Sequence, residues 1–409
     1  MTPFELSVRF FLQLAVILLA CRAVGWIAQR LGQPQVMGEI IAGILLGPSI
    51  FGLFFPQAQT WLFPQESKPI LFAICQVGLA IFMFLVGLEF DFDLIKTRLR
   101  SAAAVSISGI IGPFLLGVGA AYFLMESYPF FSPQTSTLEG MLFLGAAMSI
   151  TAFPVLARII SDRRLTGTSV GTLTLAAGSI DDAAAWCILA IVLASFAGDA
   201  NIAIWAIGGG LAYVALVALV IRPLVRRTFK PWAEKQGTVD HTLLSLTLGL
   251  VMLGSWFTDA IGIYAVFGAF ILGMAMPRGL FAEDLHRKLL PITSCLLVPL
   301  FFVYSGLNTR ITLINSWNLV GVTLLILVLA ITGKGVVCAI AARLNGETLR
   351  NSIAVGALMN ARGLMELIIL NIGLERGVIT PTLFTIMVMM AILTTLMATP
   401  IFDRVYKRA

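Results

Sequence analysis

The stretch Gly178-Ser179-Ile180-Asp181-Asp182-Ala183-Ala184-Ala185-Trp186 places two adjacent carboxylates inside an otherwise apolar run from Val170 to Ala197. If this run crosses a bilayer as a helix, Asp182 lies near its middle. An ionisable side chain at that depth is costly to insert, and such residues generally mark ion pathways, proton relays or binding sites. The stretch therefore predicts a membrane-embedded fold with a functional site inside it.

The composition of the whole chain agrees with a membrane protein. Of its 409 residues, 59% are hydrophobic and 12% are charged, whereas soluble domains carry about 25% charged residues. The formal net charge of +6 is spread over short connections, so no nucleic-acid partner is expected. The five cysteines lie in apolar runs without metal or redox spacing, which indicates buried thiols. No resident cofactor is expected.

The apolar stretches predict an all-α polytopic membrane protein with about thirteen transmembrane helices. Their approximate limits are 7–29, 36–53, 69–89, 101–125, 137–161, 168–197, 201–224, 241–258, 261–276, 288–307, 316–343, 349–374 and 380–403. Most lysines and arginines fall on alternate connections. This pattern predicts a multi-pass protein of a cell membrane, of the bacterial inner-membrane type, with its N-terminus outside and its C-terminus in the cytoplasm.

Weak internal similarities keep one order along the chain. Residues 42–47 resemble 268–273, and residues 145–151 resemble 356–362. The members of each pair lie seven spans apart, so the two copies cross the membrane in opposite directions. This predicts two inverted six-helix repeats joined by a linker helix, an architecture typical of secondary transporters.

Two of the predicted spans carry a polar interruption at matching places. Span 5 contains Thr151-Ala152-Phe153-Pro154, in which Pro154 removes a backbone donor and obstructs the preceding turn. Span 12 contains Asn360-Ala361-Arg362-Gly363, in which Gly363 relaxes the backbone. We therefore expect both spans to be discontinuous helices that cross near the midplane. Their free helix ends need charged neighbours, with cations at the C-terminal ends and carboxylates at the N-terminal ends.

A set of polar and charged residues falls near these interruptions. A hard monovalent cation prefers oxygen ligands, which Asp182, Asp181, Thr151, Ser149 and the carbonyls of the broken helices supply. The same carboxylate takes up a proton when the cation leaves. The pattern thus predicts binding of a transported monovalent cation, with protons as the second substrate.

The cations of this set have two interpretations. Lys334 in span 11 and Arg362 in span 12 can balance the C-terminal helix ends, and Glu366 lies one turn beyond Arg362, where the two can pair. Lys334 can instead form an ion pair with Asp181 that only joins two helices. For Arg362, charge balance and a part in transport are equally supported.

The motifs together resemble a known family. Residues 150–158, the Asp181-Asp182 pair, residues 359–367 and residues 84–90 are similar to motifs of the monovalent cation:proton antiporter-2 family, which includes bacterial sodium/proton antiporters and plant cation/proton exchangers. The resemblance covers essentially the whole chain. It implies a homodimer in a lipid bilayer, with scaffold and core helices. The expected segments are 1–90 (scaffold, helices 1–3), 91–200 (core, 4–6), 201–240 (linker helix 7 and a cytoplasmic loop), 241–310 (scaffold, 8–10) and 311–409 (core, 11–13).

The resemblance also implies a function and residue roles. We expect a secondary-active antiporter that exchanges Na⁺ or K⁺ for protons by an elevator-type movement of the core. Asp182 would carry the cation or the proton, and Asp181 would meet Lys334 in a proton-sensitive ion pair. The Asn360-Ala361-Arg362-Gly363 motif resembles plant-type exchangers, several of which handle potassium, so the choice between Na⁺ and K⁺ stays open.

Two other functions share single features with this sequence. An intramembrane aspartyl protease also uses two buried aspartates, but on different helices, because they must face each other across a peptide bond. Here Asp181 and Asp182 are adjacent on one helix. A passive cation pathway or channel is the other alternative, although the sequence shows no repeat typical of a selectivity filter. Enzyme activity is therefore not expected.

Overall fold

The structure is a computed structural model of the whole chain, and it describes residues 2–89, 99–163, 165, 168–196, 200–261 and 265–406. Some side chains within these ranges lie outside the description, including those of Pro154 and Asp182. The described residues form helices. Their one extended pairing is an isolated bridge between Phe131 and Ile379, beside which Ser132 N donates to Val378 O and Thr380 N to Phe130 O.

Nine helical stretches in the described part of the chain are long and apolar enough to cross a membrane. A crossing needs about 20 predominantly apolar residues. The prediction of an all-helical polytopic membrane protein is therefore confirmed, whereas the count of thirteen helices stays a prediction. Two of the expected spans, 137–161 and 349–374, are each divided into two shorter helices.

The chain separates into two compact units. The first contains residues 1–19, 60–90 and 193–304, and the second contains residues 20–59, 91–192 and 305–409. Four helices contribute residues to both units: α1 (Pro3–Arg30), α4 (Pro56–Leu62), α10 (Ser169–Phe196) and α16 (Val298–Asn308).

The first unit is built around a close packing of two helices, α5 and α14. Its elements are η1 (Gln65–Ser67), α5 (Lys68–Glu89), α11 (Ala200–Leu216), η2 (Val217–Ile221), α12 (Arg222–Gln236), α13 (His241–Ala260), α14 (Ala265–Ala275), α15 (Leu280–Ile292) and η3 (Thr293–Leu297). A Cβ added to Gly273 would overlap the carbonyl oxygen of Phe84, and one added to Gly87 would overlap that of Phe270. Small residues at such contacts let helix backbones approach closely in a membrane protein.

Gly273→Ala is therefore expected to destabilise the protein by about 1–3 kcal/mol, because the new methyl group forces the two helices apart. Gly249 in α13 is the matched control, since a Cβ there meets nothing within 4 Å. Gly249→Ala should be neutral or stabilising, because alanine favours a helix over glycine. Thermal unfolding of the purified variants checks this, and equal melting temperatures would contradict the close-packing argument.

One helix of this unit is longer than expected. The predicted span 201–224 is followed in the structure by α12, which continues to Gln236. Val225 and Ala233 are buried on one side of α12, so an apolar stripe extends the helix beyond the bilayer-length segment. The helix ends where Gly237 adopts a left-handed conformation with φ of 68°, which glycine tolerates best.

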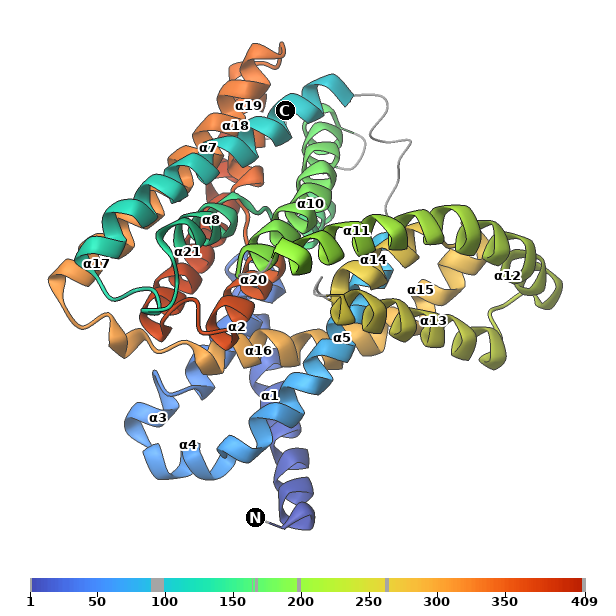
Figure 1. Cartoon of the computed structure of the whole chain (residues 1–409), viewed down its shortest axis with the longest axis horizontal. Helices are drawn as coiled ribbons and strands as arrows, with labels where there is room; N and C mark the ends of the chain where they lie inside the picture. The colour runs from blue at the N-terminus through green and yellow to red at the C-terminus, as the bar shows by residue number, and fades with distance from the viewer. Residues whose placement is uncertain are drawn as a thin grey trace. The chain divides into compact units, whose positions relative to one another are not determined.

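The second unit contains both interrupted helices. Its elements are α2 (Gln35–Leu46), α3 (Phe51–Phe54), α7 (Leu99–Ser127), α8 (Thr137–Ser149), α9 (Phe153–Asp162), η4 (Ile311–Leu313), α17 (Trp317–Ala330), η5 (Ile331–Val336), α18 (Val337–Leu344), α19 (Leu349–Met359), α20 (Leu364–Glu375) and α21 (Pro381–Val405), with most of α10. Figure 1 shows α7 lying along α17 and α18.

Glycines bring α7 close to its neighbours in this unit. A Cβ on Gly117 would lie 2.8 Å from the Cα of Gly145 in α8, and a Cβ on Gly112 would lie 2.6 Å from the carbonyl oxygen of Gly333 in η5. The buried core nearby joins α9, α10, α18 and α19, with Leu156 among its fully buried side chains. These contacts place α7, α8, α10 and η5 around one buried region, where the polar residues gather.

Candidate functional site

The two interruptions face each other in the second unit. Residues 150–152 separate α8 from α9, and residues 360–363 separate α19 from α20. The backbone N–H of Ala152 donates to the carbonyl oxygen of Ala361 at 3.2 Å. Four helix ends therefore meet in one place, and each leaves backbone groups without an intrahelical partner.

The two residues expected to break the helices, Pro154 and Gly363, lie at the starts of the helices that follow the interruptions. Pro154 is the second residue of α9, where the missing N–H is one that a helix start leaves unbonded anyway. The interruption lies upstream of it. Gly363 lies directly before α20, and a Cβ there would come within 2.9 Å of a methyl group of Val155. Gly363 therefore allows the second interruption to approach the first turn of α9.

Two buried cations bind the C-terminal end of α8. Arg362 donates from Nη1 to the carbonyl of Ala147 at 3.3 Å and from Nη2 to that of Met148 at 2.6 Å. Lys334 Nζ donates to the carbonyl of Ser149. These are three of the carbonyls that the end of a helix leaves unbonded, and they carry the negative end of the helix dipole. The structure thus puts Arg362 and Lys334 where cations were expected.

Asp181 is held by three partners in the same region. Its Oδ2 lies 2.7 Å from Lys334 Nζ and accepts a hydrogen bond from Thr151 Oγ1 at 2.6 Å. Its Oδ1 accepts from Ser106 Oγ at 2.5 Å. All four side chains are buried. A buried ion pair is tolerable only when good geometry and further hydrogen bonds compensate for lost hydration, and both conditions are met here.

Lys334 reaches this position from a π-helical turn. Residues Ile331–Val336 form η5, which interrupts the α-helical run between α17 and α18. Gly333 lies against α7, because a Cβ there would be 2.8 Å from the Cα of Pro113. Such single-turn widenings of a helix frequently occur at functional sites. Lys334 lies between two glycines in this turn, and the close approach of Gly333 to α7 brings the lysine to the buried region.

Ser149 and Thr151 contribute in different ways. The Ser149 hydroxyl donates to Ala146 O in its own helix at 2.8 Å, so its carbonyl rather than its hydroxyl lies at Lys334. The Thr151 hydroxyl binds Asp181 and also lies 3.3 Å from the carbonyl of Met359, the last residue of α19. Thr151 therefore connects the carboxylate to both interruptions.

Asn360 and Glu366 are buried beside the second interruption. Asn360 follows α19 as its C-terminal cap, and its side-chain oxygen has no hydrogen-bond partner within the described residues. Glu366 lies in the first turn of α20, where a carboxylate suits the helix dipole. Its Oε2 is 3.5 Å from Arg362 Nη1, but neither of its oxygens makes a hydrogen bond to the part of the chain that the structure describes. The contact is therefore a buried ion pair without a short hydrogen bond.

Glu366→Gln is accordingly expected to cost less than about 1.5 kcal/mol of stability, because no short hydrogen bond is lost and the carbonyls of α8 still hold Arg362. Thermal unfolding in detergent measures this. A loss of more than about 3 kcal/mol, as for breaking a well-formed buried pair, would show that Glu366 rather than the end of α8 compensates Arg362.

The central residue of the sequence prediction is only partly located. Asp182 lies in α10 directly after Asp181, but its side chain lies outside the described residues. Its role as carrier stays a prediction.

Sequence reasoning missed two residues of this site. Ser106 in α7 donates to Asp181, and Thr395 in α21 bonds both the N–H and the carbonyl of Arg362 through its hydroxyl, at 2.7 and 2.8 Å. Single hydroxyl residues are common in membrane helices, where they can bond their own backbone, so their presence in spans 4 and 13 carried no specific signal.

Comparison with known proteins shows the family to which the chain belongs. The family model for the transmembrane region of sodium/hydrogen exchangers matches residues 15–407. The chain belongs to the sodium/hydrogen exchanger family. Relatives of the chain are named as Na⁺/H⁺ and K⁺/H⁺ antiporters, which are transporters rather than enzymes and exchange these ions as substrates. The facing interruptions and the buried ion pair are therefore features of a cation/proton antiporter family member in a membrane.

Several named relatives resemble the chain over nearly its whole length. It is 40% identical to the Na⁺/H⁺ antiporter NhaS4 of Synechocystis sp., covering 96% of this chain and 95% of that protein. It is 39% identical to Cation/H⁺ antiporter 17 of Arabidopsis thaliana, over 97% of this chain and 48% of that protein. The K⁺/H⁺ antiporter 1 of Saccharomyces cerevisiae is 31% identical, over 97% and 46%. The chain thus spans about half the length of its plant and yeast relatives.

A solved structure supports the fold. The sodium proton antiporter MjNhaP1 from Methanocaldococcus jannaschii superposes with a TM-score of 0.66, covering 97% of this chain and 96% of that one at 17% sequence identity. At that identity the similarity concerns the fold alone. It agrees with the all-helical membrane architecture predicted from the sequence.

Proposed function

We propose that this protein is a secondary-active antiporter that exchanges a monovalent cation, Na⁺ or K⁺, for protons across a bacterial inner membrane. The observation that carries the proposal is the buried Asp181–Lys334 pair, which lies beside two facing helix interruptions. A site of this kind combines oxygen ligands with groups that change protonation, as cation/proton exchange requires. Relatives named as Na⁺/H⁺ and K⁺/H⁺ antiporters agree with both ions.

In this proposal the two adjacent aspartates have different tasks. Ser106, Thr151 and Lys334 already take three of the roughly four acceptor sites of the Asp181 carboxylate, which leaves less room there for a cation. Asp182 is then the carrier carboxylate, and Asp181 with Lys334 is a proton-coupled neighbour. Arg362 and Lys334 hold the end of α8 in position while the carrier changes its occupant.

The proposed architecture has thirteen spans in two inverted repeats of six with a linker helix, an N-terminus outside and a C-terminus in the cytoplasm. The scaffold helices form a homodimer and the core carries the site in an elevator-type movement. The compact second unit, which holds both interrupted helices, Asp181 and Lys334, supports a moving body of this kind.

Reconstitution tests the proposal directly. The purified protein in liposomes, adsorbed to a solid-supported membrane, should give transient currents or internal pH changes on steps of Na⁺ or K⁺, and an imposed pH gradient should drive cation movement. Series of Na⁺, K⁺ and Li⁺ at several pH values give selectivity and charge per cycle, with protein-free liposomes as the control. Cation flux without proton movement, or single-channel currents, would refute antiport and favour a passive cation pathway.

Lys334→Gln is expected to change the pH profile or the charge moved per cycle while leaving part of the exchange. The glutamine can still donate to Asp181 or Ser149, but it carries no charge to balance the carboxylate. Lys230→Gln is the control, because Lys230 is exposed. If the pH profile and electrogenicity of Lys334→Gln equal those of the control, the ion pair only joins two helices.

A further inference from the structure

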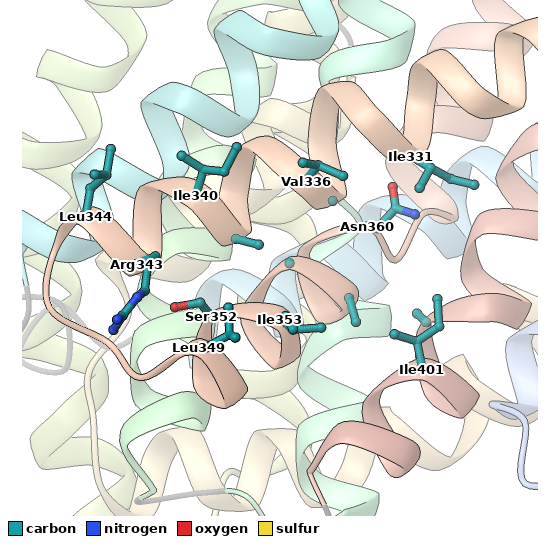
Figure 2. A pocket seen from close by; sticks show the side chains of 15 residues that line it. Ile331, Val336, Ile340, Arg343, Leu344, Leu349, Ser352, Ile353, Asn360 and Ile401 are labelled. Carbon is teal, nitrogen blue, oxygen red and sulfur yellow. The ribbon is translucent and has the colours of Figure 1, made fainter.

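An apolar groove of about 390 Å³ lies on the second unit, and Asn360 of the second interruption is among the residues that line it. Figure 2 shows it between the run of η5 and α18 on one side and α19 and α21 on the other. Ile340, Leu344, Leu349 and Ile353 line it and are exposed. Exposed apolar residues on a spanning helix face lipid tails rather than water, so the groove opens toward the bilayer.

One end of the groove carries a positive charge. Arg343 lines it at the end of α18, close to the turn into α19, as Figure 2 shows together with Leu344 and Leu349. In the proposed topology both helices enter the membrane from this turn, which puts the turn at a membrane surface. Arg343 Nη1 donates to the carbonyl of Glu347 at 2.8 Å. A guanidinium has five donors arranged in a planar fork, and its geometry matches a phosphate group.

The length of the groove fits a lipid tail. Its lining extends from Ile331 to Leu344, a rise of about 20 Å, which exceeds the roughly 15 Å that one leaflet contributes to a hydrocarbon core of about 30 Å. The inner end reaches Asn360, whose buried side-chain oxygen has no hydrogen-bond partner in the described part of the chain. A chain from one leaflet therefore fills the apolar part and ends near the second helix interruption.

We propose that this groove binds one acyl chain of an anionic phospholipid, whose headgroup phosphate is held by Arg343. The volume favours a single chain over another helix, because an α-helix with its side chains is about 10–12 Å in diameter. The positive charge at the membrane surface favours an anionic headgroup over a zwitterionic one. The tail contacts Ile340, Ile353 and Ile401.

Binding is measured by native mass spectrometry of the purified protein with dioleoyl-phosphatidylglycerol and, separately, dioleoyl-phosphatidylcholine, which share the same acyl chains. Arg343→Gln should lower the affinity for phosphatidylglycerol about tenfold, as expected for losing a charge-assisted hydrogen bond, and should lower the affinity for phosphatidylcholine less, because the choline group already cancels the charge of its phosphate. Arg376→Gln is the matched control, because Arg376 is an exposed arginine at the other end of the α19–α20 pair. Equal losses in the two variants would overturn the headgroup assignment.

A second measurement locates the tail. Phosphatidylglycerol with a photoreactive diazirine in its acyl chain should label residues 331–360 more strongly than the exposed apolar face of α17, which includes Leu325. Ile353→Trp narrows the groove from its exposed side and should remove this label, whereas Leu325→Trp should not. Equal labelling of both faces would mean ordinary lipid contact, and wild-type protein unlabelled at 331–360 would mean that another occupant, such as a second copy of the chain, covers the groove. Either result refutes the proposal.

Discussion

Asp182→Asn is expected to abolish cation-coupled proton exchange, with a fall in rate of at least about a hundredfold, as is usual when a proton-transferring group is removed. The amide cannot exchange a proton for a cation. It is also less costly to bury than a carboxylate, so the variant should fold at least as stably as the parent protein. Proton and cation fluxes in liposomes, together with thermal unfolding, measure both parts.

Asp182 is assigned as carrier because Asp181 is already engaged by three partners. The two oxygens of Asp181 receive hydrogen bonds from Ser106 and Thr151 and an ion pair from Lys334, all buried. Asp181→Asn is therefore the informative comparison. It leaves Lys334 without its counter-ion, so it should lower stability by about 3–5 kcal/mol and still leave measurable exchange. Exchange that survives Asp182→Asn but disappears in Asp181→Asn would reverse the assigned roles.

Arg362→Met is expected to destabilise the protein by about 3–5 kcal/mol, the range for removing one member of a buried ionic network. The guanidinium is fully buried and holds the carbonyls of Ala147 and Met148. Methionine fills similar space but donates no hydrogen bond, so both carbonyls and Glu366 lose their partner. Each buried polar group left unpaired costs about 1–3 kcal/mol. Thermal or denaturant unfolding in detergent gives the value.

Arg163→Met is the control for this measurement. Arg163 makes a two-bond contact with Asp403, but their side chains are 28% and 48% exposed, so the loss should stay near 1 kcal/mol or less. Arg362→Lys should recover only part of the stability, because a single ammonium group cannot reproduce the planar fork that reaches two carbonyls. Similar losses for Arg362→Met and Arg163→Met would contradict a stabilising role at the end of α8.

The sequence was most informative about charged side chains in apolar spans, because burying a charge costs free energy. Lys334 and Arg362 are charges in apolar spans, which drew attention to both, and in the structure both side chains donate to carbonyls at the end of α8. The contacts of Ser106 and Thr395 could not be predicted. A hydroxyl in a membrane helix can bond the backbone of its own helix, so its presence does not indicate a particular partner. The π-helical turn at Lys334 depends on how η5 packs against Pro113, which is a tertiary contact. The predicted span 201–224 also ended too early, because its length was set by the thickness of a membrane, whereas α12 continues to Gln236.

The isolated bridge between Phe131 and Ile379 has a mechanical consequence for the interrupted helices. It ties the segment before α8 to the segment after α20, and the bond between Ala152 and Ala361 ties the same two chain segments again at the interruptions. Regions more than two hundred residues apart in sequence are thus joined beyond both ends of α8 and α20. A displacement of one outer segment therefore reaches both interruptions, and we expect α8 and α20 to move together rather than independently.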